Sequence, residues 1–159
     1  MTPTLIKSKT CLALILFILG IFLMMPQNTL AAITLVQTKN GYASGSTSVS
    51  VVFTSGPTQN NLLVAIVGNR DSATAPTTPS GWSVAISETQ NTPGQVIFYK
   101  IAGTSESSTV TVSNYGTATN LGMHIYEYSG ITTSSPLDQT NSASGNSATA
   151  STGSITTTY

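Results

Sequence analysis

After residue 32 the apolar positions alternate with hydroxyl-bearing ones or cluster in short runs, and helical periodicity is absent. Val110 and Val112, for example, alternate with Thr and Ser. Such alternation, with Gly, Pro, Asn and Ser between the runs, is typical of strands that bury one face. The predicted strands are residues 33–38, 47–54, 62–69, 82–87, 96–102, 109–113 and 121–128, with a weaker Ser/Thr-rich strand within 148–158.

Short strands at regular spacing predict an all-β domain, an antiparallel β-sandwich of the jelly-roll or immunoglobulin-like kind. Residues 62–67 and 96–101 are apolar on both faces, so we place these two strands at the centre of a sheet. Asn40-Gly41 and Ser80-Gly81 are predicted turns, because Asn and Gly accept a positive φ.

The C-terminal part of the chain is of low complexity. Residues 142–154 consist largely of Ser, Ala, Thr and Gly, and residues 155–159 begin a further alternating pattern. One interpretation is a ragged edge strand rich in threonine; the other is a chain that is part of something longer. We favour the second and expect the sandwich domain, residues 33–159, to be incomplete at its C-terminal end.

The N-terminus has the three parts of a secretory signal peptide. Lys7 and Lys9 supply positive charge, residues 11–25 are an uncharged apolar run, and small residues allow cleavage after Ala31 or Ala32. This run of 15 residues is shorter than the roughly 20 that a helix needs to span a bilayer. We therefore expect residues 1–32 to be a cleaved signal-peptide helix rather than a membrane anchor. No stable membrane span would remain, and the domain would be secreted or displayed on the cell surface.

Hydroxyl groups outnumber charges in the expected mature chain. Of its 127 residues, 44 are Ser or Thr, and only Lys39, Arg70 and Lys100 are cationic, too few to neutralise a run of phosphates. Nucleic acid is therefore excluded as a partner. One histidine and no cysteine after residue 11 exclude thiolate zinc sites, disulfides and cysteine nucleophiles. Asp138 is more typical of a turn cap than of a calcium loop, and we expect no metal or cofactor.

Five phrases of the sequence occur in a recognisable order. They are NLLVAIVGN (61–69), PSGW (79–82), IFYKIA (97–102), EYSGI (127–131) and SPLDQT (135–140). Together they resemble a group of secreted bacterial β-sandwich modules, which occur, often repeated, in large extracellular or surface proteins. The resemblance covers about residues 33–158 and implies a fold and a location. The group has no agreed activity, so it implies no catalytic residues.

Enzymatic chemistry finds little support in the sequence. Glycoside hydrolysis needs two facing carboxylates about 5–9.5 Å apart, yet Glu88 and Glu106 fall in polar turns and Glu127 ends an apolar strand. A Ser-His-acid hydrolase would need His124, which lies mid-strand, and no Gly-x-Ser-x-Gly elbow is present. We predict that the domain is not an enzyme.

Lys100 and Glu127 are the charged residues of two apolar strands. They could form a cross-strand ion pair, worth less than about 1 kcal/mol if exposed. A sharper alternative is a Lys–Asn isopeptide bond beside a buried acid, with Asn114 or Asn120 as the partner. Ordinary pairing is the favoured interpretation.

Aromatic residues give the best binding signal. If the aliphatic residues of strand 121–128 face the core, the opposite face carries His124, Tyr126 and Tyr128. Phe98 would join them if its strand is adjacent. Exposed tyrosines can stack on sugar rings while their hydroxyls form hydrogen bonds. The alternatives are a face covered by further strands or a loop, and a protein-interaction patch. Trp82 is either a rim platform of this site or a core residue.

The sequence thus favours an exported non-enzymatic structural, adhesion or interaction module of a bacterial surface or secreted protein. The alternative is a carbohydrate-binding module that uses the aromatic sheet face. A glycoside-active enzyme domain is a more distant alternative. Polysaccharide and cell-surface protein are the partners that these functions imply.

Overall fold

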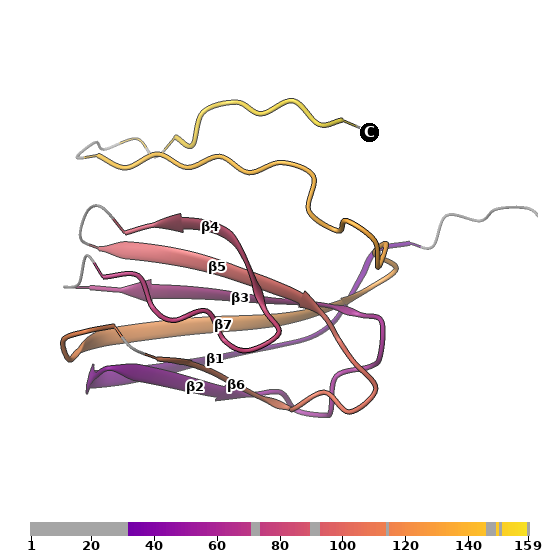
Figure 1. Ribbon diagram of the computed structural model, residues 1–159, viewed down its shortest axis with the longest axis horizontal. Helices are drawn as coiled ribbons and strands as arrows, with labels where there is room; N and C mark the ends of the chain where they lie inside the picture. The colour runs from indigo at the N-terminus through magenta and orange to yellow at the C-terminus, as the bar shows by residue number, and fades with distance from the viewer. Residues whose placement is uncertain are drawn as a thin grey trace, which may run out of the picture. The chain divides into compact units, whose positions relative to one another are not determined.

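The computed structural model describes residues 32–70, 74–89, 93–113, 115–145, 149 and 151–158 (Figure 1). The expected signal peptide lies outside these residues, apart from Ala32. Within them, no helix is long and apolar enough to cross a membrane. All regular secondary structure in the described part is β-strand, which confirms the predicted all-β class.

The strands form two antiparallel sheets. The larger has the order β1-β7-β3-β5-β4 and the smaller consists of β2 and β6, an arrangement consistent with a β-sandwich. The strands are β1 (Thr34–Ser46), β2 (Ser48–Val52), β3 (Leu62–Asn69), β4 (Ser83–Glu88), β5 (Gly94–Ile101), β6 (Thr109–Ser113) and β7 (Thr119–Ser129). As predicted, the strands that are apolar on both faces are internal: β3 lies between β7 and β5, and β5 lies between β3 and β4.

The core is built from the inner face of each sheet. Alternation along each strand sends every second side chain inward, and the two sheets share one hydrophobic cluster. The smaller sheet contributes Val49, Val51, Val110 and Val112, and the larger contributes Leu63, Ala65, Val67, Val96, Phe98, Leu121, Met123 and Ile125.

The smaller sheet is narrower than the sheet that it covers, and the loop before β4 fills part of the remaining space. Pro76 is buried, the backbone N–H of Thr77 donates to the carbonyl of Ser113 at 3.0 Å, and Trp82 packs against the core. The inner face of β4 is less well covered, since Val84, opposite Phe98, remains 44% exposed.

One predicted turn is wrong and the other is confirmed. Asn40-Gly41 lies inside β1, where Gly41 is opposite Met123. Glycine is needed there for close packing, because a Cβ would lie 2.7 Å from Cγ2 of Val51 on β2. At the second turn Gly81 has a φ of 77°.

The weak strand predicted within 148–158 is not formed: its described residues, 149 and 151–158, belong to no strand.

Candidate functional site

Strand β7 places three rings on the outer face of the larger sheet, the face turned away from β2 and β6. Met123 and Ile125 of β7 have no exposed surface, so the residues that alternate with them point outward, as predicted. Neighbouring rings have centroids 6.4 Å and 6.1 Å apart, and their planes are inclined by 17° and 18°. We call these side chains the aromatic row: His124, Tyr126 and Tyr128.

The strand register identifies the neighbours of the aromatic row, because directly opposed residues of paired strands share a face. Tyr126 is opposite Val64 of β3, and Val64 is opposite Tyr99 of β5. Two further rows repeat this relation. Together they form what we call the outer-face patch: Tyr128, Leu62 and Ile101; Tyr126, Val64 and Tyr99; His124, Ile66 and Ile97. His124 is exposed and the other patch residues are half-buried.

The outer-face patch contains no acidic side chain and no lysine or arginine. The charged residues of its strands, Lys100 and Glu127, are both opposite Leu63, which is buried in the core, so both belong to the inner face. On β1 the uncharged Thr38 and Asn40 lie opposite the aromatic row. The patch is therefore apolar at its centre and free of fixed charge, and its β1 side is polar opposite Tyr126 and His124 but apolar opposite Tyr128, where Leu35 lies.

The prediction that Phe98 contributes to the aromatic face is wrong. Phe98 has no exposed surface and belongs to the core, and β3 separates its strand from β7. The ring on the outer face of β5 is that of the next residue, Tyr99. Sequence reasoning missed Tyr99 because this strand is apolar on both faces, and alternation alone does not say which face is inner. Trp82 is half-buried against the core, as its alternative interpretation proposed.

Glu127 is buried and forms a hydrogen-bond network with amide groups. Its side chain accepts hydrogen bonds from Nε2 of Gln37 at 2.5 Å, Nδ2 of Asn61 at 2.6 Å and the backbone N–H of Thr58 at 2.8 Å. Burial raises the pKa of the Glu127 carboxyl, but these hydrogen bonds outweigh it and hold the pKa below its ordinary value of 4.5. The network joins β7, β1 and the loop before β3.

The predicted contact between Lys100 and Glu127 is wrong. β3 lies between their strands, and Nζ of Lys100 instead lies 2.9 Å from Oε2 of Glu106. Burial raises the pKa of the Glu106 carboxyl, and the Lys100 ammonium and the Gly103 N–H lower it to a net value below 4.5. Of the asparagines considered for an isopeptide bond, Asn120 lies at the other end of β7 from Glu127, and Asn114 lies outside the described residues.

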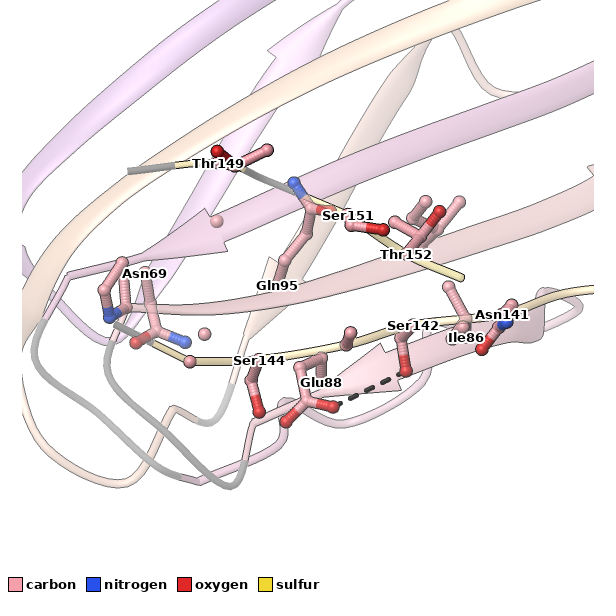
Figure 2. Close-up of a pocket in the computed structure, with 16 residues that line it drawn as sticks. Asn69, Ile86, Glu88, Gln95, Asn141, Ser142, Ser144, Thr149, Ser151 and Thr152 are labelled. Atoms are coloured by element: carbon pink, nitrogen blue, oxygen red, sulfur yellow. Dashed lines mark hydrogen bonds between the residues drawn. The ribbon is translucent and has the colours of Figure 1, made fainter. Parts of the chain in front are cut away.

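A pocket of about 1030 Å³ lies between the larger sheet and the C-terminal segment, residues 131–158 (Figure 2). Its sheet side includes Ile86, Gln95 and Ile97, and its other wall consists of Ser, Thr, Asn, Ala and Gly residues between 141 and 152. The Ser142 hydroxyl donates to Oε2 of Glu88 at 3.5 Å, which joins the segment to β4. Ile97 also belongs to the outer-face patch, so the segment approaches the patch from its β5 side.

The acidic groups placed by the structure have separate partners. Glu127 binds amides, Glu106 binds Lys100, Glu88 accepts from Ser142, and Asp138 accepts from the N–H and hydroxyl of Thr158. Among the residues that the structure covers, no group of three or more His, Cys, Asp or Glu side chains gathers as a metal site would require.

Comparison of the chain with protein-family models, with curated proteins and with solved structures finds no match in any of the three. The resemblance of its sequence phrases to secreted β-sandwich modules therefore stays a prediction.

Proposed function

We propose that this domain is a non-enzymatic structural, adhesion or interaction module of an exported bacterial protein, and that it binds its partner through the outer-face patch. The patch is the observation that carries the proposal. Contiguous apolar surface on a folded domain marks an interaction site. Its residues lie on β3, β5 and β7, each paired on both sides, which holds the patch in a fixed geometry suited to binding.

The contacts of Glu127 and Glu106 support a non-enzymatic role. Glu127 ties the loop before β3 to β1 and β7, and Glu106 closes the β5–β6 loop on Lys100. Groups held in this way serve the scaffold, since a catalytic acid would have to face a substrate.

The proposal includes the finer fold and the location predicted from the sequence. Residues 1–32 would be a cleaved signal peptide, and the domain would be a jelly-roll or immunoglobulin-like sandwich in the medium or on the cell surface. Expression of the full chain in a bacterial host tests this part. We expect protein outside the cytoplasm that begins at Ala32 or Ile33, measured by intact mass. Protein that stays in the cytoplasm with residues 1–32 attached would contradict the proposal.

Binding is tested by sedimentation of the purified domain with bacterial cell envelopes. Val64→Glu places a charge at the centre of the patch, and we expect it to abolish co-sedimentation. Val52→Glu is the matched control, because Val52 lies on β2 and is 54% exposed, away from the patch. Circular dichroism verifies that both variants fold. Equal co-sedimentation of the two variants would remove the patch from the proposal.

A further inference from the structure

We infer that the aromatic row binds a neutral polysaccharide chain that lies along β7. This inference rests on the proposed function and names the class of ligand that the outer-face patch would recognise.

The arrangement of the row favours a linear ligand. Its rings lie on alternate residues of one strand, with neighbouring centroids 6.1–6.4 Å apart and nearly parallel planes. A line of similar groups at similar spacing offers repeated contacts to a ligand that is itself a repeating chain. A compact ligand would contact only one or two of the three rings.

The chemistry of the row fits sugar rings. Pyranose rings have apolar C–H faces and a rim of hydroxyls, so they pair with side chains that combine an apolar body and a polar tip. Tyr126 and Tyr128 have this character, and His124 adds ring nitrogens. Thr38 and Asn40 of β1, opposite Tyr126 and His124, add polar groups beside these two rings. Sugar recognition needs apolar ring faces and hydrogen-bonding groups side by side, and the aromatic row with Thr38 and Asn40 provides both.

The charges of the domain favour a neutral chain. Uronic acids, sulfated sugars and phosphorylated polymers need cationic partners, and no lysine or arginine belongs to the outer-face patch. Lys100 is held by Glu106 on the inner face. Lys39 of β1 is opposite the buried Ile125, and thus also belongs to the other face.

The C-terminal segment reduces the part of the outer-face patch that a partner can contact. Across the pocket of Figure 2 it faces Ile86 and Ile97, on the β4 and β5 side of the sheet. Strands β3 and β5 contribute residues to this pocket, whereas the aromatic row on β7 contributes none. A single polysaccharide chain can be bound by one row of rings, whereas stable protein interfaces bury about 800 Å² on each partner.

Affinity electrophoresis of the purified domain tests the inference. The gels contain hydroxyethylcellulose, xylan, mannan or a mixed-linkage glucan as neutral probes, and polygalacturonate as the charged one. We expect retardation by at least one neutral polysaccharide and none by polygalacturonate. Tyr126→Ala should weaken that retardation about tenfold, since an aromatic contact contributes up to about 1.5 kcal/mol. Tyr126→Phe keeps the ring and should retain most of the affinity.

Val52→Ala is the control, because Val52 is an exposed side chain of β2, which belongs to the other sheet. Retardation by no neutral polysaccharide, or equal retardation of Tyr126→Ala and Val52→Ala, would overturn the inference. Sedimentation with cell envelopes then separates the two ideas. If the domain binds no glycan but binds cell envelopes, and Val64→Glu abolishes the envelope binding, the domain is an interaction module with a protein partner. If the domain binds neither glycans nor cell envelopes, the proposed function is rejected as well.

Discussion

Glu127 is a carboxylate without exposed surface whose hydrogen-bond donors at Gln37, Thr58 and Asn61 are amides rather than a cation. A buried charge is costly unless several donors compensate for its lost hydration. Here the donors come from a strand and a loop that are distant in sequence, so the ionised form of Glu127 stabilises the packing of both against β7.

This arrangement predicts a dependence of stability on acid. Because the pKa of Glu127 is lower in the fold than its ordinary value of 4.5, its contribution is present above that value and is lost as the pH falls through the folded-state pKa. We expect Glu127→Gln to lower the free energy of unfolding at pH 7 by about 1–3 kcal/mol, because it leaves buried donors unmatched. Urea unfolding of both proteins between pH 7 and pH 3 provides the measurement.

The variant should also lose less stability than the wild-type domain on acidification. Asp138→Asn is the control, because it removes a carboxylate from the C-terminal segment, outside the core cluster. If Glu127→Gln shows the wild-type slope of unfolding free energy against pH, the role given to the Glu127 charge is incorrect.

For individual residues, the sequence predicted which side chains of β7 face outward but not which side chains meet across strands. The alternation around Met123 and Ile125 was sufficient to place the aromatic row. Whether Lys100 meets Glu127 depends on the strand order, and the insertion of β3 between β5 and β7 has no signature in the residues themselves.

Strand β5 shows the limit of pattern analysis for a single element. Residues 96–101 are apolar on both faces apart from Lys100, so alternation of apolar and polar residues does not identify the inner face. The structure resolves it: Phe98 lies in the core, and Tyr99 is half-buried on the opposite face.

Truncation of these neighbouring residues tests the orientation of β5. Phe98→Ala should lower the free energy of unfolding by about 3–5 kcal/mol, because it creates a cavity in the core. Tyr99→Ala removes a similar ring from the outer face and should cost less than half as much. Urea denaturation of the two variants at neutral pH decides between the faces, and equal losses or the reverse order would contradict the assignment.

The positions of the other strands were largely predictable from the sequence. The exceptions are explained by contacts between strands. Each strand of the structure overlaps a predicted one. Strand β1 is longer than predicted because Gly41, which suggested a turn, lies where β1 approaches Val51 too closely for a side chain. A glycine required for packing and one required for a turn look the same in a sequence.

For the whole domain, the division into five and two strands could not be derived from strand count. The loop before β4 occupies space beside β6 through Thr77, whose N–H bonds Ser113. The prolines around Thr77 indicate a loop, but they do not indicate that this loop covers the core.

The fold of the domain should not require the C-terminal segment. The core cluster lies between Val49 and Ile125, and residues 132–145 are mostly exposed. We expect a chain that ends at Ile131 to keep its β-type circular dichroism and its free energy of unfolding within about 1 kcal/mol. A chain that ends at Tyr126, which lacks Glu127 and the end of β7, should fail to fold. Loss of cooperative unfolding in the chain that ends at Ile131 would show that the C-terminal segment is structural.

The pairing of Thr34 with Ser129 has a mechanical consequence. The chain enters β1 and leaves β7 at the same end of one strand pair, with Gly130 against the backbone of Ala32. A pulling force applied at Ala32 and Gly130 would break the β1–β7 hydrogen bonds one after another, that is, in the unzipping geometry. Force spectroscopy should therefore record a lower rupture force with handles at residues 32 and 130 than at 32 and 119, where the same bonds are sheared together. In a tethered array, such a domain would yield early and spare its neighbours.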